Sequence, residues 1–289
     1  RWPIEQLQDN MYISPGNLVI LAAEPSVGKT AFTLQCALHW AKSQNVGFFS
    51  YDTPFEDLED RLVSHGMTIP YDDILRHRLN EKQWSRFGYI GAQNANRSLS
   101  VEIANGMTVS DIRARTIQKG YDVIVIDYLQ QISSKGSSRY EQVTNISLGL
   151  KQLATSLGVI VIALSQVSRS DDGHAPRNSD LRESGQLEQD ADVVIFLKLR
   201  NQADKTGPRG LYVTKFKRGS LFKTSLAFDG EHQTFFWISE VAAKAYDAQR
   251  QSGKKPKIGE TAVPEIPEQT EVPGQMDMLP EDTPAAFKK

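Results

Sequence analysis

The residues best suited to chemistry lie in one loop, Ala23–Thr30, which reads Ala-Glu-Pro-Ser-Val-Gly-Lys-Thr. An apolar run, Leu18–Ala22, precedes the loop, and a stretch typical of a helix, Ala31–Lys42, follows it. In a strand–loop–helix of this kind, backbone N–H groups and the helix N-terminus bind phosphate oxygens, and the lysine contacts the β- and γ-phosphates. The sequence therefore predicts a phosphate-binding loop made of Pro25, Ser26, Val27, Gly28, Lys29 and Thr30.

We also make predictions for Thr30 and Ala23, the residues at the two ends of this loop. Thr30 would hold Mg²⁺ through its hydroxyl group. Ala23 stands at the first motif position, where glycine is usual, so we expect its backbone to avoid positive φ. The alternative is a loop-to-helix turn that spells Gly-Lys-Thr by chance. The flanking strand and helix, together with a partner aspartate later in the chain, favour the phosphate site.

Three polar side chains end or follow other apolar runs of the chain. Asp127 follows one of them directly, where a carboxylate can face Mg²⁺ through water. Asp52 follows the run after the loop's helix, and its carboxylate can orient or deprotonate an attacking water molecule. Gln166 follows a third run, and its amide can contact a γ-phosphate and report its presence to the next loop. We expect these side chains at the carboxyl edge of one sheet.

Each of the three has a structural alternative. Asp127 can cap a turn at the end of its strand. Asp52 and Thr53 can cap a helix that begins near Pro54. Gln166 can bind the backbone as an ordinary strand-end residue.

Apolar runs alternate with helical stretches over residues 1–240. Such runs indicate parallel strands of a sheet covered by helices on both faces, and hence the α/β class. After Asp192 the runs are spaced by Gly and Pro, which predicts antiparallel strands at the far edge. We predict strands over Leu18–Ala22, Val46–Ser50, Asp122–Ile126, Val159–Leu164, Val193–Lys198, Gly210–Lys215 and Thr224–Phe228, and helices over Ala31–Lys42, Phe55–Ser64, most of 65–100, Val109–Lys119 and Gln142–Leu157.

Composition excludes several classes of protein. The 289 residues include 33 Lys and Arg against 35 Asp and Glu, so any polyanion must be bound by local clusters of charge. A single cysteine, Cys36, excludes an internal disulfide framework and a cysteine-based zinc site. The sequence shows no secretory signal and no apolar stretch near the roughly 18 residues of a membrane span, so we expect a cytoplasmic protein. Because it begins with Arg1, we expect a piece of a longer chain.

Several segments together resemble the C-terminal motor domain of DnaB-type replicative helicases, of bacteria or phages, which have a RecA-like P-loop fold. The resemblance covers roughly 15–240, in order and with family-like spacing. It rests on the loop 23–30, Phe49-Ser50 before a carboxylate, Thr108–Arg115, Val125–Gln130, Ala163–Val167, Ser179–Gly185 and Glu188–Asp192.

This resemblance implies a motor that assembles as a hexameric ring with ATP and Mg²⁺ at the subunit interfaces. Such rings encircle single-stranded DNA, translocate 5′→3′ and unwind duplexes, with a primase and a helicase loader as partners. Lys29 and Thr30 then bind phosphate and metal, Asp127 is the Walker B carboxylate, and Gln166 is the γ-phosphate sensor. Two alternatives are a RecA/RadA-like recombination ATPase and a hydrolysis-poor module that assembles or loads others.

The resemblance also places DNA contacts in the loop that holds Arg182, Glu183 and Gly185. An arginine and main-chain N–H groups can hold phosphates without reading bases, which suits a motor that ignores sequence. The alternative is a solvated charge pair on a surface loop.

Two positions depart from the family pattern. Asp52 stands where the family has glutamate, and its carboxylate lies about 1.5 Å further back. The family's lysine and arginine that reach the neighbouring subunit's γ-phosphate fall on Lys215 and Lys217, with Arg218 next in sequence. A lysine lacks the planar fork of arginine, whereas a one-residue bulge would bring Arg218 into place. Both departures concern turnover rather than nucleotide binding.

We expect three parts in the chain: an N-terminal segment that ends a linker (1–14), the motor domain (15–244) and a flexible tail (245–289). From Gln251 onward the chain holds 6 of its 13 prolines and a single aromatic residue, too little to order it. Within the tail, Gln275–Leu279 is similar to peptides that dock on bacterial sliding clamps, and a chance match is the alternative.

Overall fold

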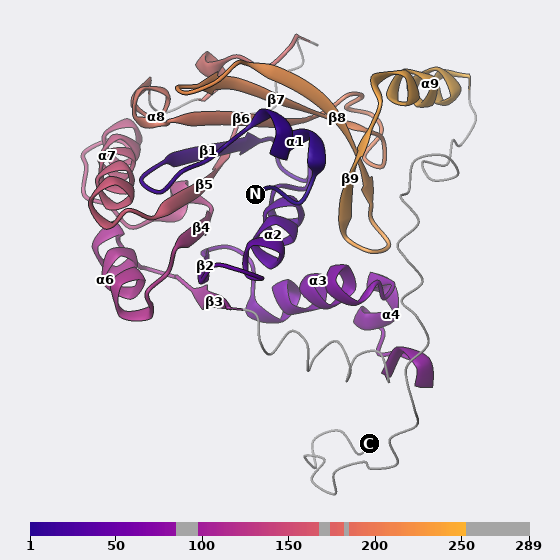
Figure 1. Cartoon of the computed structure of the whole chain (residues 1–289), viewed down its shortest axis with the longest axis horizontal. Coiled ribbons are helices and arrows are strands. Elements are labelled where there is room, and N and C mark those ends of the chain that lie inside the picture. Colours follow the sequence, from indigo (N-terminus) through magenta and orange to yellow (C-terminus); the bar gives the residue numbers. More distant parts are fainter. Residues whose placement is uncertain (85–97, 168–173, 182–184, 253–289) are drawn as a thin grey trace, which may run out of the picture.

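Nine strands of the described residues form one sheet, in the order β3-β2-β4-β5-β1-β6-β7-β8-β9 (Figure 1). The computed structural model describes residues 1–84, 98–167, 174–181 and 185–252. Pairs from β3 across to β6 are parallel and those from β6 to β9 are antiparallel, which confirms the predicted sheet. The strands are β1 (Leu18–Ala23), β2 (Val46–Ser50), β3 (Leu99–Ile103), β4 (Val123–Asp127), β5 (Ile160–Gln166), β6 (Val193–Leu199), β7 (Arg209–Phe216), β8 (Phe222–Asp229) and β9 (Thr234–Ile238).

Helices cover both faces of the sheet (Figure 1). α6 and α7 lie on one face, and α1 and α2 lie on the other. The helices are α1 (Glu5–Asn10), α2 (Lys29–Trp40), α3 (Phe55–Met67), α4 (Tyr71–Leu75), α6 (Val109–Lys119), α7 (Arg139–Leu157), α8 (Gly185–Asp190) and α9 (Glu240–Gln251), with 3-10 turns at Leu129–Gln131 and Asn178–Asp180.

Successive residues of the central strand β1 enter two separate cores. Val19 and Leu21 pack in the cluster that contains α1 and α2, whereas Leu18 and Ile20 pack in the cluster that contains α6 and α7. Side chains alternate between the faces of a strand, so a strand buried on both faces has no polar position. Each such side chain contributes about 1.5–3 kcal/mol by burial, which fixes β1 and hence the loop that follows it.

Two strands were not predicted. β3 falls within and just beyond the stretch 65–100, which we expected to be helical. Its sequence Leu-Ser-Val-Glu-Ile lies at the sheet edge, half-buried to exposed, so it lacks the continuous apolar run of a central strand. β9 closes the antiparallel edge, with Phe235 buried in the core around α2 and Ile238 buried on the opposite face of the strand, whereas Trp237 is 39% exposed.

The ends of the described chain are packed more fully than expected. Trp2, Ile4, Leu7 and Met11 are buried in the core around α2, so residues 1–14 are part of the folded unit. Helix α9 runs through the predicted boundary at 244 to Gln251, and 253–289 lie outside the described residues. The domain boundaries stay predictions. Among the described residues, no helix combines the length and apolar character needed to cross a bilayer.

Candidate functional site

The loop after β1 has the backbone geometry expected of a phosphate cradle. Ala23 is the last residue of β1 and is extended, as we expected of a motif that lacks its first glycine. Positive φ occurs instead at Ser26, with φ of 64°, and at Gly28, with φ of 109°. Left-handed backbone at a residue such as Ser26 is uncommon and clusters at ligand-binding loops.

Thr30 and Asp127 meet across the start of α2 and the end of β4. The Thr30 hydroxyl donates to Asp127 Oδ2 at 2.6 Å. The Asp127 side chain is 4% exposed, and burial raises its pKa, although the hydrogen bond from Thr30 and the charge of Lys29 oppose the rise. The predicted pair of Mg²⁺ residues is therefore assembled, and the turn-capping alternative for Asp127 does not describe its contact.

Lys29 belongs to the phosphate-binding loop and is also the first residue of α2. Its Nζ is 3.4 Å from the carbonyl oxygen of Ala23. Burial lowers the pKa of Lys29, and the charges of Asp127 and Asp52 partly offset this effect. A partly desolvated ammonium group attracts a phosphate more strongly than one in water does, because less solvent screens its charge.

The charge of Asp52 raises the pKa of both Lys29 and Asp127, which indicates that Asp52 lies close to both. Helix α3 begins after Pro54 with no side-chain cap, so the capping alternative for Asp52 and Thr53 is wrong. Ser50 fixes the turn instead, because its hydroxyl donates to the carbonyl of Thr53 at 2.7 Å. The carboxylate of Asp52 is exposed and available to a ligand.

Gln166 ends β5, next to β1, where Ala23 pairs with it in register. Its side chain is exposed and makes no hydrogen bond within the described part of the chain, which removes the backbone-bound alternative. Its main chain is held by Gln130, which we did not predict as a site residue. The amide of Gln130 accepts from Gln166 N at 3.2 Å and donates to Gln166 O at 3.1 Å.

Gln130 had one signal in the sequence. It lies three residues after Asp127, within a segment that carried the family resemblance. It is 6% exposed and also donates to Ser165 Oγ at 3.0 Å. This buried amide therefore joins the segment after β4 to the end of β5.

Lys215, Lys217 and Arg218 lie near the start of β1, at the end of the strand opposite to the phosphate loop. The backbone N–H of Lys217 donates to Asp192 O, and Asp192 N donates to the carbonyl of Leu18 at the start of β1. Arg218 Nη1 donates to Ser14 Oγ at 3.3 Å, again before β1 begins. The six residues of β1 span about 20 Å, so these side chains lie far from the phosphate loop of their own chain.

The bulge that we considered in this segment does occur, although it precedes all three charged residues. The register of β6 and β7 shifts between Val194 and Ile195, which leaves Thr214 as the extra residue of β7. Lys217 and Arg218 follow the end of β7, so strand alternation does not choose between them. Lys215 Nζ donates to the carbonyls of Glu188 and of Gln189, the latter at 3.1 Å.

Asp192 joins three elements at this end of β1. It accepts hydrogen bonds from Lys151 Nζ at 2.6 Å, Leu18 N at 2.8 Å and Lys217 Nζ at 3.0 Å. Burial opposes its ionisation, but these hydrogen bonds hold the pKa of Asp192 below its usual range. The ionised carboxylate therefore stabilises the junction of β1, α7 and β7.

We expect Asp192→Asn to lower the free energy of unfolding by about 2 kcal/mol at neutral pH, the cost of losing hydrogen bonds to a charged group. Because the folded pKa is depressed, this contribution is present above the unfolded pKa and is lost as pH falls through the folded pKa. Urea unfolding at neutral and acidic pH measures the change, with the exposed Asp9→Asn as control. An equal loss of stability at both pH values would contradict the assignment.

The predicted DNA loop is described only in part. Arg182 and Glu183 lie outside the described residues, and Gly185 is the first residue of α8. A side chain at Gly185 would meet nothing within 4 Å. α8 packs on α7 through Leu187, and Asp190 Oδ2 accepts from Ser147 Oγ at 2.7 Å. Lys215 donates hydrogen bonds to the carbonyls of Glu188 and Gln189 near the C-terminal end of α8.

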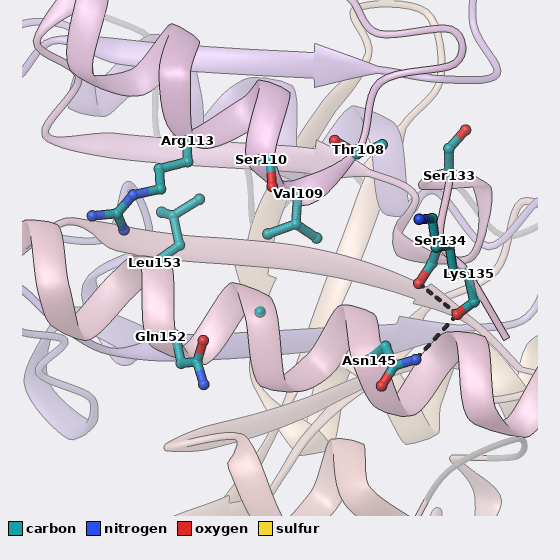
Figure 2. Close-up of a pocket in the computed structure, with 11 residues that line it drawn as sticks. Thr108, Val109, Ser110, Arg113, Ser133, Ser134, Lys135, Asn145, Gln152 and Leu153 are labelled. Atoms are coloured by element: carbon teal, nitrogen blue, oxygen red, sulfur yellow. Dashed lines mark hydrogen bonds between the residues drawn. The ribbon is translucent and has the colours of Figure 1, made fainter.

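A groove between α6 and α7 lies apart from these residues (Figure 2). Its volume is about 740 Å³, and none of the predicted site residues lines it. Figure 2 shows Val109 and Leu153 between the two helices, with Arg113 and Asn145 around them. Asn145 Nδ2 donates to the carbonyl of Lys135 at 3.1 Å, which ties α7 to the loop before it.

The fold and the phosphate-binding loop after β1 define a P-loop nucleoside triphosphatase with a RecA-like sheet. More specifically, the chain belongs to the family of DnaB-like helicase C-terminal domains, whose model matches residues 6–236. The predicted resemblance is thereby confirmed.

Known proteins resemble the chain over most of its length. It is 36% identical to the replicative DNA helicase DnaB of Geobacillus stearothermophilus over 235 residues, which are 76% of this chain and 52% of that protein. One solved ATPase domain is 31% identical, with a TM-score of 0.76, and the match covers 82% of this chain and 90% of that domain. A DnaB-like replicative helicase solved in a study of its interactions with primase has a TM-score of 0.77 and 31% identity, over 83% of this chain and 63% of its own. The chain thus spans about half the length of the curated relatives it matches.

Proposed function

We propose that this chain is the motor of an ATP-dependent replicative DNA helicase, which forms a hexameric ring around single-stranded DNA, translocates 5′→3′ and unwinds duplexes. The observation that carries the proposal is that the predicted site residues lie in two groups, one at each end of the central strand β1. Lys29, Thr30, Asp127 and Asp52 gather at one end, and the residues suited to act on a neighbour lie at the other. Membership of the DnaB-like family supports the same function.

The residues of the phosphate loop fit ATP with Mg²⁺. Backbone N–H groups of the loop bind the phosphates, and Lys29 contacts the β- and γ-oxygens. Thr30 and Asp127 offer oxygen atoms, the ligands that Mg²⁺ prefers, and their 2.6 Å contact places both at one point. When bound, Mg²⁺ neutralises charge on the phosphates.

Asp52 and Gln166 complete the site around the γ-phosphate. Asp52 orients or deprotonates the attacking water, for which its exposed carboxylate is available. Gln166 contacts the γ-phosphate and transmits its presence to the loop that follows β5. The hydrogen bonds from Gln130 support this role, because they fix the main chain of Gln166 and leave its side chain to the ligand.

Subunit contacts supply the remaining charges. In the proposed ring, Lys215 and either Lys217 or Arg218 reach the phosphates bound by a neighbouring copy. They lie about 20 Å from their own loop, which is too far to reach the phosphates bound there. Arg182, Glu183 and Gly185 grip the DNA backbone inside the ring. A primase, a helicase loader and, through Gln275–Leu279, a sliding clamp are further proposed partners.

Strand displacement on a forked duplex tests the proposal. We expect ATP-dependent displacement, ATPase activity that single-stranded DNA stimulates, and assembly that light scattering detects with nucleotide and DNA present. Strand exchange without displacement would instead identify a recombination ATPase. A monomer under all these conditions would remove the ring from the proposal.

The shorter side chain at position 52 leads to a further prediction. A misplacement near 1 Å can reduce a rate by about a hundredfold, so we expect Asp52→Glu to raise kcat by at least about tenfold. KM should change little, because the carboxylate acts on water rather than on the nucleotide. Steady-state ATPase assays with single-stranded DNA measure both, with Asp52→Asn as the inactive control. If Asp52→Glu and Lys217→Arg both leave kcat unchanged, these departures do not limit turnover.

A further inference from the structure

A buried arginine lies behind the phosphate loop, on the side away from Asp127. Arg209, the first residue of β7, is 2% exposed. Its Nε donates to the carbonyl of Val27 at 3.3 Å. Its two Nη atoms donate to the carbonyls of Gly207 and of Lys205, the latter at 2.8 Å. The guanidinium therefore joins the loop 205–207 to the phosphate loop.

The positive charge of Arg209 has no carboxylate hydrogen-bonded to it within the described residues. Its acceptors are backbone carbonyls, and the rings of Phe228 and Phe235 lie 5.0 Å and 5.9 Å from it. The nearby Asp204 pairs with Arg250 instead, at 3.1 Å. Burial lowers the pKa of Arg209 to about 10, which still leaves it charged at neutral pH. Burial of this cation is costly, and the three carbonyls, the two rings and the charge of Asp204 offset part of that cost.

The contact with Val27 fixes the orientation of one peptide in the loop. In a trans peptide the carbonyl and the following N–H point in opposite directions. With the Val27 carbonyl directed at Arg209, the N–H of Gly28 points away from the buried arginine. Gly28 is the position at which positive φ lets the loop turn into α2.

Phe235 supports the same turn from behind. A side chain at Gly28 would come within 2.8 Å of its ring. Gln35, further along α2, accepts from Phe235 N and donates to Phe235 O, both at 2.8 Å. Arg209, Phe235 and α2 thus form one packed support beneath the loop.

We propose that Arg209 is a positioning residue of the phosphate site, which holds the Val27 carbonyl so that the Gly28 N–H faces the phosphates. The inference rests on the proposed function, that this loop binds a nucleotide. It adds a cation behind the loop that attracts the phosphates without touching them. The family motif does not contain Arg209, because the residue lies 182 positions from Val27 in the sequence.

ADP affinity, measured by titration calorimetry, tests the proposal. We expect Arg209→Met to weaken ADP binding about tenfold, the effect of losing one hydrogen bond from a charged donor. Arg209→Lys keeps the charge but cannot span three carbonyls, so its loss should be smaller, about threefold. In ATPase assays KM should rise with the dissociation constant, while kcat stays within about twofold, because Arg209 does not touch the reacting atoms.

Val213→Ala is the matched control. Val213 is buried on the same face of β7, and its truncation removes apolar packing without removing a hydrogen bond to the loop. Its ADP affinity should equal that of the wild type, and thermal melts identify variants that do not fold. Wild-type ADP affinity in either folded Arg209 variant overturns the inference. Failure of the wild type itself to bind ADP, or unchanged binding by Lys29→Met, would instead overturn the proposed function.

Discussion

Replacement of Lys29 by methionine is expected to reduce kcat for ATP hydrolysis by about a thousandfold, the upper range for loss of one preorganised electrostatic contact. Lys29 is a partly desolvated cation at the start of α2, beside Asp127 and Asp52. The charges of both carboxylates act on its pKa, which places the ammonium group close to them. Methionine keeps the aliphatic stem of the side chain, so the variant removes the charge with little loss of packing.

The stability of the same variant separates a catalytic loss from a folding defect. Because burial lowers the pKa of Lys29, its ammonium group is less stable in the folded chain than in the unfolded chain. The free energy of unfolding of Lys29→Met should therefore equal or exceed that of the wild type. Lys42→Met, at an exposed lysine beyond the end of α2, is the control and should keep full activity. ATPase activity of Lys29→Met near the wild-type value would contradict the site.

Removal of the charge that acts between subunits is expected to have a comparable effect. An arginine finger contributes about a thousandfold or more to kcat, so either Lys217→Ala or Arg218→Ala should lose that much. Nucleotide affinity should stay unchanged, since both side chains lie at the end of β1 opposite their own phosphate loop. The variant with the larger loss identifies the residue that acts in trans.

A mixing experiment decides whether this residue belongs to a neighbour's site. Lys29→Met has an intact finger, and the inactive finger variant has an intact phosphate loop. Interfaces between the two variants combine the intact parts, so the mixture should regain part of the wild-type ATPase activity. No recovery on mixing, with assembly confirmed by light scattering, would show that the finger does not act across an interface.

Much of the site follows from local sequence because strand ends converge. The loop 23–30 is a contiguous motif, and Asp127 and Gln166 each end a strand of a parallel sheet, so their neighbourhood follows from topology alone. The antiparallel strands were predictable from a different local signal, the Gly and Pro residues that space the apolar runs after Asp192. Edge strands were harder: β3 mixes polar and apolar residues, so its sequence did not stand out from the stretch 65–100 that we expected to be helical.

Other parts of the site depend on contacts that no local pattern encodes. Gln130 acts through the backbone of a residue 36 positions away, and Arg209 through one 182 positions away. Neither burial nor partner can be read from the sequence around them. The roles of Arg182 and Glu183 stay predictions, because both lie outside the described residues.

The placement of the two sets of charges at opposite ends of β1 restricts how copies of this chain can associate. A two-fold symmetric pair would have to bring both ends of the sheet to one interface, which their separation of about 20 Å disfavours. On the proposal that Lys217 or Arg218 acts on a neighbour, association is head-to-tail, and each contact completes a single nucleotide site. A closed assembly has as many complete sites as copies, whereas an open arc has one fewer, and its terminal loop binds nucleotide without a partner to trigger hydrolysis.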